Sequence, residues 1–226
     1  MRGARKERTV KARQAEIIAE RTFEGVESIH GVAFDGQAVW FAHGDRGDLM
    51  SAEPESGRVL RRLKAPASAG VAFDGRHLWV VGGGRIRKID PASGAAVGEV
   101  PGFDATPVSG LAWADGALYA GIYRERKILK IDPERGAVLR TLVSDRLVTG
   151  VTWTDGDLWH GVMCEAEGAP SELRRVDPRS GEVLDRLALP ESVRLSGVEA
   201  DASGRLWCGD PATGRLRAVK KPRKAV

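Results

Sequence analysis

Short apolar segments alternate with turn residues along most of the chain, which is typical of β-strands and not of helices. One pattern, a glycine followed by alternating apolar and small residues, recurs at spacings of 39, 40, 40 and 47 residues. The repeats begin at Gly31, Gly70, Gly110, Gly150 and Gly197. A period of about 40 residues predicts a repeat fold in which each unit is one supersecondary element.

Each unit contains signals for four strands. The opening strand is followed by Asp-Gly, or by Ser203-Gly204 in the fifth unit, and then by a second apolar segment around an aromatic residue (Trp40, Trp79, Tyr119, Trp159 or Trp207). We expect type I′ turns at these pairs, because such turns need positive φ at both central positions. A third strand ends in Asp-Pro at 90–91, 132–133 and 177–178, and a glycine turn then leads into a fourth strand. Four antiparallel strands in about 40 residues predict a β-propeller blade.

The fifth unit ends after its third strand, at residues 215–219. Residues 15–23 match the fourth-strand pattern, so we expect the N-terminal strand to complete the last blade and close the ring. The fold class predicted is therefore all-β, a five-bladed β-propeller of four-stranded antiparallel blades. It forms a single domain over 15–219, between a basic extension at 1–14 and a basic tail at 220–226.

Strand alternation predicts how neighbouring blades pack. The small residues Ala33, Ala72, Ala112 and Thr152 share one face of the opening strands with the glycines, while Val or Leu and Phe or Trp occupy the other face. Large side chains of one blade can then fit against small ones of the next, with about 2–3 kcal/mol for each buried aromatic. We interpret the aromatic residues as packing between blades and not as cofactor ligands.

Composition supports a globular protein, with 42% hydrophobic and 29% charged residues. No apolar run approaches the roughly 18 residues of a membrane span, and no apolar segment follows the basic N-terminus. We expect a cytoplasmic monomer that does not enter a membrane. Cys164 and Cys208 are then expected to be reduced, and they lack the spacing of a zinc site.

The net charge of +4 is unevenly distributed along the chain. Residues 1–13 carry +5 and residues 215–226 carry +6, so the rest of the chain is acidic, with −7. Such ends can make weak, salt-dependent contacts with phosphates, but the body lacks basic residues interleaved with stacking aromatics. We interpret the ends as solvated termini and do not expect a specific nucleic-acid partner.

The two faces of the ring differ in sequence. Turns after the first and third strands are uniform, whereas the connections after the second and fourth strands vary, and variable loops on a rigid scaffold often hold the functional site. The residue before each repeat glycine lies at the channel mouth on this variable face, and His30 and Ser196 become neighbours when the ring closes. The residues that we expect to bind a ligand there are His43, Tyr123, Arg124, His160, Ser196 and Asp210.

Glu199 stands where four other units have Ala or Thr. A half-buried carboxyl needs partners, and burial raises its pKa toward the range of a general acid or base, so we expect Glu199 and His30 to be catalytic if the protein is an enzyme. The alternative is a structural Glu199 that meets an arginine or a backbone amide. His160 and Cys208 occupy equivalent positions where packing is also expected, and His43 with Asp45 could bind a cation.

The opening at 110–119, Gly-Leu-Ala-Trp-x-Asp-Gly-x-Leu-Tyr, and the turn at 131–136, Ile-Asp-Pro-x-x-Gly, resemble the glutamine cyclotransferase family of five-bladed propellers. The resemblance spans about 15–219; the gluconolactonase and streptogramin-lyase propellers are similar more loosely. The resemblance to the glutamine cyclotransferase family implies cyclisation of an N-terminal glutamine to pyroglutamate at the channel mouth, without a metal or an organic cofactor. Glu199 matches a family acid, His30 stands at a family Gln, and Ser196-Gly197 stands at a family Asn-Glu pair.

Two functions are therefore open. The first is binding of a small polar ligand or peptide N-terminus, with a metal-independent cyclotransferase, lyase or hydrolase-like activity if the site is catalytic. The second is a non-catalytic interaction scaffold that binds a protein partner on the variable face, with the basic tails adding electrostatic attachment.

Overall fold

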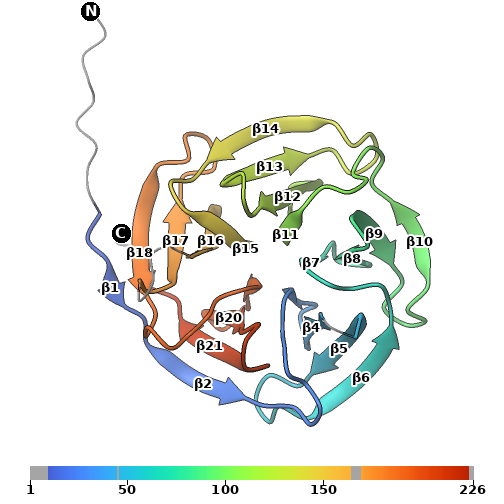
Figure 1. The fold of residues 1–226 in the computed structure, drawn as a ribbon, viewed down its shortest axis with the longest axis horizontal. Helices are drawn as coiled ribbons and strands as arrows, with labels where there is room; N and C mark the ends of the chain where they lie inside the picture. The colour runs from blue at the N-terminus through green and yellow to red at the C-terminus, as the bar shows by residue number, and fades with distance from the viewer. Residues whose placement is uncertain (1–9, 45, 164–168, 224–226) are drawn as a thin grey trace, which may run out of the picture.

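The computed structural model describes residues 10–44, 46–163 and 169–223, which form a closed ring of five antiparallel sheets (Figure 1). The first blade contains β3 (Val32–Phe34), β4 (Val39–His43), β5 (Asp48–Ala52) and β6 (Val59–Lys64). The second contains β7 (Val71–Phe73), β8 (Leu78–Gly82), β9 (Arg85–Ile89) and β10 (Ala96–Glu99). The third contains β11 (Val108–Ala114), β12 (Ala117–Ile122), β13 (Lys127–Ile131) and β14 (Val138–Val143). The predicted five-bladed propeller is confirmed.

The last two blades contain the two ends of the chain. The fourth contains β15 (Leu147–Thr154), β16 (Asp157–Met163), β17 (Glu172–Val176) and β18 (Val183–Ala188). The fifth contains β19 (Val198–Ala200), β20 (Arg205–Gly209), β21 (Leu216–Lys220) and the N-terminal β2 (Ile17–Arg21). β2 pairs antiparallel with β21, as predicted for ring closure. In the described part of the chain, no helix has the length and apolar character required to cross a membrane.

A second N-terminal strand was not predicted. β1 (Arg13–Gln14) pairs in parallel with β18, so the fourth blade has a fifth strand at its outer edge. The Arg13 guanidinium also donates a 2.5 Å hydrogen bond to Asp185, and the amide of Ala15 bonds to the carbonyl of Ala188. The segment from β1 to β2 therefore supplies the outermost strand of two successive blades.

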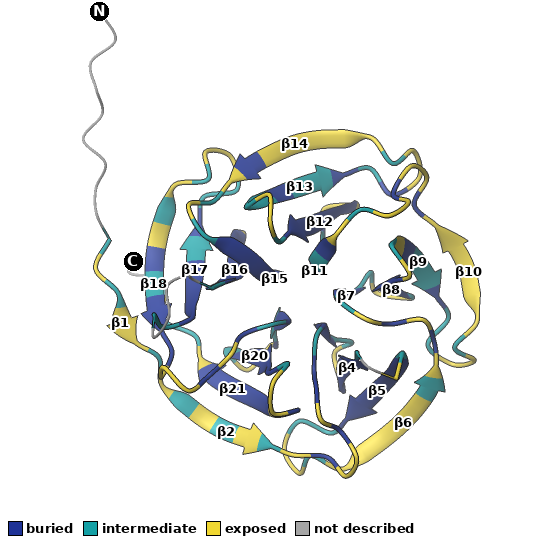
Figure 2. Cartoon of the chain, in the orientation of Figure 1, coloured by how far each residue is buried: buried dark blue, intermediate teal, exposed yellow. Residues whose placement is uncertain are grey.

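The core lies between the blades, as strand alternation predicts. Inner strands are buried and outer strands are exposed on their outward side (Figure 2). In one cluster Ala33 and Trp40 of the first blade pack with Val71 and Leu78 of the second. At the next interface Trp79 stacks on Trp113, with ring centroids 6.0 Å apart. The aromatic residues are thus packing residues of the blade interfaces.

The repeat glycines form a continuous ring of backbone contacts around the centre. A Cβ on Gly31 would lie 2.0 Å from the carbonyl oxygen of Ala69, and the same close approach recurs from Gly70 to the third blade and from Gly110 to the fourth. Gly150 meets Ser196 in the same way. A Cβ on Gly197 would lie 2.5 Å from the carbonyl oxygen of His30, which completes the circle. Glycine is required because the inner strands approach one another too closely for any side chain.

The turn prediction is only partly confirmed. Asp115-Gly116 and Asp155-Gly156 have positive φ at both residues, as type I′ turns require. In the first, second and fifth blades only the glycine has positive φ, so the expected type I′ turn is wrong there. At Asp35 one carboxylate oxygen accepts from the amides of two following residues, and the other accepts a 2.7 Å bond from the Trp40 indole. The aspartate side chain therefore stabilises a longer loop and also fixes the aromatic residue of the second strand.

Candidate functional site

Glu199 lies on β19, the innermost strand of the fifth blade. Successive backbone amides of a strand point to opposite edges. Gly197 and Asp201 form backbone hydrogen bonds with β20, so the amide of Ala200, one residue before Asp201, points away from β20 and toward the centre of the ring. The half-buried Glu199 side chain bends to that edge, where its Oε1 accepts from the Ala200 amide at 2.8 Å. The carboxyl group therefore lies at the inner edge of the fifth blade.

The second partner of Glu199 comes from the neighbouring blade. The Thr152 hydroxyl, on β15, donates a 2.5 Å hydrogen bond to Glu199 Oε1, and the Ala200 amide also lies 3.1 Å from Thr152 Oγ1. Burial raises the pKa of Glu199 to about 8, although the hydrogen bonds from Thr152 and Ala200 act in the opposite direction. Glu199 is thus protonated at neutral pH and can both donate and accept a proton near that pH.

The structural alternative was that Glu199 pairs with an arginine or meets a backbone amide. Glu199 forms no ion pair with any of the described residues. It does meet a backbone amide. Sequence reasoning missed Thr152 as its partner. The signal available was that Thr152 is the single hydroxyl in the series Ala33, Ala72, Ala112, Thr152, in the blade directly before Glu199.

His30 and Ser196 meet at the channel mouth, where ring closure was expected to place them. The Ser196 hydroxyl donates a 2.7 Å hydrogen bond to the carbonyl oxygen of His30. Ser109, at the same position of the third blade, donates to the Val148 carbonyl at 2.7 Å, so in these two blades a hydroxyl at this position joins the blade to the next. The His30 ring packs over Gly44, where a Cβ would lie 2.2 Å from its Cδ2.

His43 is the last residue of β4, the second strand of the first blade. Asp210 directly follows β20, the second strand of the fifth blade. His43 is buried, and its Nδ1 has no hydrogen-bond partner among the residues that the structure describes. The fully buried Asp210 accepts from two turn amides and, at 2.6 Å, from Arg217 Nη1. Its carboxylate therefore orders the loop of the fifth blade.

Tyr123 and Arg124 lie in the turn between β12 and β13, on the same variable face. Tyr123 is half-buried and Arg124 is exposed, so both can reach a ligand above the ring. The residues Asp45 and Cys164 lie outside the described residues. Within the described ranges, no group of three or more His, Cys, Asp and Glu side chains is arranged to hold a metal ion.

His160 and Cys208 are buried in their blades, as the packing interpretation expects. Burial lowers the pKa of His160 to about 4, and the charge of Arg174 acts in the same direction. Burial also raises the pKa of the Cys208 thiol to about 12, so Cys208 is an unreactive thiol. His160 on β16 is in register with Val151 on β15 and with Arg174 on β17. Among the described residues no hydrogen bond connects His160 to His30 or to Ser196.

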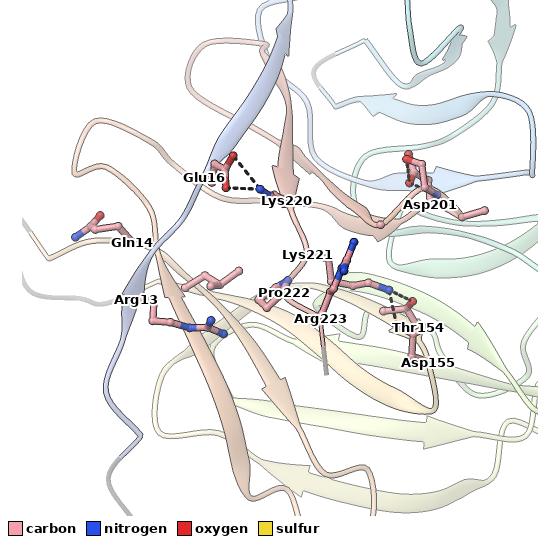
Figure 3. A pocket seen from close by; sticks show the side chains of 14 residues that line it. Arg13, Gln14, Glu16, Thr154, Asp155, Asp201, Lys220, Lys221, Pro222 and Arg223 are labelled. Carbon is pink, nitrogen blue, oxygen red and sulfur yellow. Dashed lines mark hydrogen bonds and ion pairs between the residues drawn. The ribbon is translucent and has the colours of Figure 1, made fainter. Parts of the chain in front are cut away.

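A cavity of about 980 Å³ lies on the opposite face, that of the Asp-Gly turns (Figure 3). We call it the terminal groove, because Arg13, Gln14 and residues 220–223 line it together with Asp155 and residues 201–204 of the fourth and fifth blades. None of the predicted ligand-binding residues is among its lining residues. Sequence analysis did not predict this groove.

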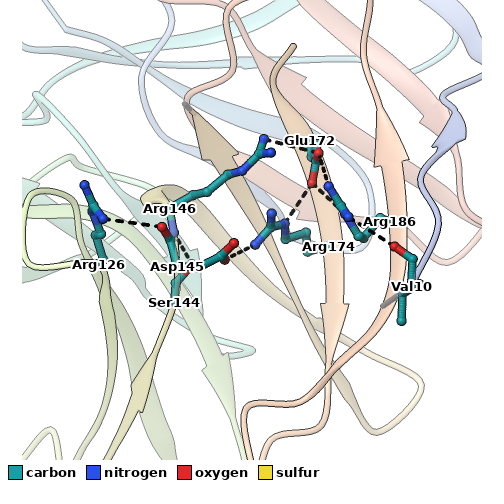
Figure 4. Close-up of polar contacts among 8 residues, drawn as sticks. All are labelled: Val10, Arg126, Ser144, Asp145, Arg146, Glu172, Arg174 and Arg186. Atoms are coloured by element: carbon teal, nitrogen blue, oxygen red, sulfur yellow. Dashed lines mark hydrogen bonds and ion pairs between the residues drawn. The ribbon is translucent and has the colours of Figure 1, made fainter. Parts of the chain in front are cut away.

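A buried charge network was also not predicted (Figure 4). Glu172, which is 3% exposed, accepts hydrogen bonds from Arg186 at 2.6 Å and from Arg174 at 2.9 Å, and it forms a 3.2 Å ion pair with Arg146. Arg174 in turn bonds to Asp145, in the connection from the third blade. Burial alone would raise the pKa of Glu172, but the hydrogen bonds from Arg186 and Arg174 hold it below its ordinary value. The network ties the fourth blade to the end of the third.

Comparisons with known proteins agree with this architecture. The family model described as glutamine cyclotransferase matches residues 1–169. The glutaminyl cyclase of Myxococcus xanthus is similar in structure, with a TM-score of 0.73 and 18% identity over 94% of this chain and 98% of that one. The likeness extends to hydrazine synthase of Kuenenia stuttgartiensis (TM-score 0.53, 15% identity, 84% of this chain and 58% of that one). A Bacteroides caccae protein of unknown function is also similar (TM-score 0.54, 14% identity, 85% and 74%). No curated protein matches the sequence.

Proposed function

Because the chain belongs to the glutamine cyclotransferase family, to whose model residues 1–169 match, we propose that it cyclises N-terminal glutamine at the channel mouth and releases ammonia. The substrate is a peptide N-terminus or a similar small polar amide. The observation that supports this most directly is the Glu199 carboxyl, which is held by Thr152 and Ala200 at the inner edge of the fifth blade and has a pKa of about 8.

The reaction needs proton transfer and no net oxidation. The α-amino nitrogen attacks the carbon of the side-chain amide, so a ring N–C bond forms and the bond to the amide nitrogen breaks. The attacking nitrogen loses one proton, and the departing nitrogen gains one to leave as ammonia. A single carboxyl group whose pKa lies near the working pH can accept the first proton and return the second. Glu199 has this property through burial.

The other predicted residues are assigned to substrate binding. His30 and Ser196 lie together at the entrance, and Tyr123 and Arg124 lie on the same variable face. The Ser196 hydroxyl already donates to the His30 carbonyl, so its oxygen is left as an acceptor for an N–H of the neutral α-amino group of the substrate. His30 would orient the substrate amide. We place His43 and Asp210 behind this entrance, where Asp210 stabilises the loop through Arg217.

The proposal is tested by ammonia release from glutamine-initiated peptides. We expect Glu199→Gln to lower kcat/KM by at least about 100-fold, the usual contribution of a general acid-base group. His30→Ala should mainly raise KM. Glu134→Gln makes the same chemical change in an exposed turn of the third blade, and it should leave the rate unchanged.

Two results would count against the proposal. Wild-type protein that releases no ammonia, although it binds these peptides in a calorimeter, would favour the non-catalytic binding function. Equal rates for Glu199→Gln and wild type would remove Glu199 from the reaction.

A further inference from the structure

Asp-Gly pairs occur at four equivalent turns of the propeller, on the face opposite the channel mouth. They are Asp35-Gly36, Asp74-Gly75, Asp115-Gly116 and Asp155-Gly156, and each directly follows the innermost strand of its blade. An aspartyl side chain can react with the amide nitrogen of the next residue, and glycine hinders this reaction least because it has no side chain. The same reactive pair thus stands in four different structural settings.

The reaction needs no reactant other than water. The amide nitrogen of the glycine attacks Cγ of the aspartate, so an N–Cγ bond forms, and the carboxyl hydroxyl leaves as water with the amide proton. Hydrolysis of the new bond in the resulting five-membered imide restores aspartate. Hydrolysis of the original peptide bond instead leaves isoaspartate, in which the backbone runs through the former side chain. The carboxyl group reacts in its protonated form and must turn onto the glycine nitrogen, so hydrogen bonds to its oxygens oppose the reaction.

In the first two blades such hydrogen bonds hold the aspartate. Oδ1 of Asp35 accepts from two backbone amides at 2.8 and 2.7 Å, and Oδ2 accepts from the Trp40 indole at 2.7 Å. Asp74 has the same three contacts, with two amides at 2.8 and 2.6 Å and the Trp79 indole at 2.9 Å. These bonds stabilise each charged carboxylate and restrict its rotation. Both aspartates are therefore protected.

In the third and fourth blades the aspartate itself has positive φ. The angle is 50° at Asp115 and 54° at Asp155, a backbone conformation that is strained for a residue with a side chain. Asp155 nevertheless has a partner, because its Oδ2 accepts a 2.7 Å hydrogen bond from Lys221 Nζ (Figure 3). Asp115 is exposed, and its carboxylate forms no hydrogen bond or ion pair with any residue for which the structure gives a position. Asp115 alone of the four thus combines a strained backbone with a carboxylate that no described residue holds.

We propose that Asp115-Gly116 is the preferred site of spontaneous isoaspartate formation in the folded protein. The nucleophile is accessible, since Gly116 is exposed and its amide donates no hydrogen bond to any described residue. The product adds one backbone carbon to a two-residue turn that connects the paired, buried residues Ala114 and Ala117. We expect this pair to separate, because the turn geometry that matches the strand twist has no place for the extra atom. The turn lies away from the channel mouth, so the modification does not depend on the proposed cyclisation.

The test is incubation of the folded protein for several weeks in mildly acidic buffer, followed by proteolysis and electron-transfer mass spectrometry, which distinguishes isoaspartate from aspartate. Asp115 should convert at least about tenfold faster than Asp35 or Asp74, because three hydrogen bonds protect each of these two. Incubation in concentrated urea is the control. There the four sites should convert at rates within about threefold of one another, since no folded structure protects any of them.

Lys221→Met tests the same reasoning at the fourth blade. Methionine keeps most of the lysine stem but cannot donate to Asp155, so conversion of Asp155 should rise at least about threefold while that of Asp115 stays unchanged. Asp115→Glu cannot form the five-membered imide. Hydrogen exchange at Ala114 and Ala117 should therefore be faster in aged wild-type protein than in the aged Asp115→Glu variant.

Three results would overturn the proposal. The first is equal conversion at all four sites of the folded protein. The second is an unmodified Asp115 in the folded sample when the urea sample has already converted. The third is a ranking of the four sites that persists in urea, since the neighbouring sequence and not the fold would then select the site.

Discussion

The hydroxyl of Thr152 on the fourth blade donates a 2.5 Å hydrogen bond to Oε1 of Glu199 on the fifth, between the innermost strands β15 and β19. The bond joins the one carboxylate and the one hydroxyl that the repeat places at this inner-strand position. It also sets the protonation of Glu199, because it favours the charged carboxylate against the effect of burial.

Replacing Thr152 by valine should therefore raise the pKa of Glu199 above its present value of about 8. Valine keeps the shape of threonine but cannot donate a hydrogen bond to the carboxylate, so less opposes the rise in pKa that burial causes. Carbon-detected NMR of the Glu199 carboxyl across a pH series measures the change directly. If the protein is active, the pH profile of kcat/KM should move in the same direction.

Thr149→Val is the matched control for that change. Thr149 lies on the same strand, is buried, and its hydroxyl has no hydrogen-bond partner among the described residues. Its replacement should leave the pKa of Glu199 unchanged and should not lower stability, since a buried hydroxyl without a partner is unfavourable. A shift of equal size in both variants would show that the Thr152 hydrogen bond does not control Glu199.

Glu199 should also make folding stability decrease with rising pH. Its pKa is about 8 in the folded protein, against an ordinary value of 4.5, so between these pH values the folded state binds the proton more strongly than the unfolded state. The stability that this gives is fully present below about pH 4.5 and is lost as pH rises through 8. Glu199→Gln should therefore gain stability relative to wild type between pH 5 and pH 8.5, as measured by urea unfolding.

The Glu134→Gln variant provides the comparison, because this glutamate is exposed in a turn. Its unfolding free energy should follow the wild-type curve over the same pH range. A Glu199→Gln curve parallel to wild type would mean that the carboxyl is solvated and ionised in the folded protein.

Gly197→Ala should destabilise the ring by about 3 kcal/mol or more. Its Cβ would lie 2.5 Å from both the His30 carbonyl oxygen and the Val32 amide nitrogen, and backbone atoms of the next blade cannot move aside as a side chain can. Gly98→Ala in β10 is the control, since its Cβ would lie 3.8 Å from the nearest atom, an ordinary contact. We expect a change within about 1 kcal/mol there. Similar losses of unfolding free energy for Gly197→Ala and Gly98→Ala, measured with urea, would contradict a closed glycine ring.

The repeat made most of this fold predictable. The period of the glycines predicted the blades, and the missing fourth strand of the last unit predicted closure by residues 15–23, of which 17–21 form β2. β1 could not be predicted in this way. Its two residues, Arg13 and Gln14, have no apolar alternation, and they join β18 through the backbone.

The candidate site was less predictable than the fold. Glu199 was visible as a departure from the repeat, but its hydrogen bond with Thr152 depends on the side chain bending toward the channel edge. The turn at Asp35 differs from type I′ for a similar reason, since its carboxylate captures two amides and the Trp40 indole. In both cases a side-chain hydrogen bond decided the geometry: for Glu199 it comes from the neighbouring blade, and for Asp35 from amides and an indole within five residues.

The charge network of the fourth blade makes the strongest prediction for stability. Glu172→Gln should cost about 3–5 kcal/mol in urea unfolding near pH 7, because it removes the buried carboxylate partner of Arg174, which then keeps only the more exposed Asp145 among the described residues, and weakens the bonds from Arg186. The exposed pair of Glu125 and Lys127, 3.0 Å apart, is the control, and Glu125→Gln should cost at most about 1 kcal/mol.

The loss caused by Glu172→Gln should itself depend on pH. Because the arginines hold the pKa of Glu172 below its ordinary value of 4.5, its contribution to stability is present above that pH and is lost as the pH falls through the lower folded value. The difference between Glu172→Gln and wild type should therefore shrink in acid. His160 is common to both proteins, so its own effect, a fall in stability between pH 6.5 and about 4, cancels to first order in the comparison. A difference that stays constant down to low pH would show that the loss comes from altered packing and not from the removal of a charge that three arginines surround.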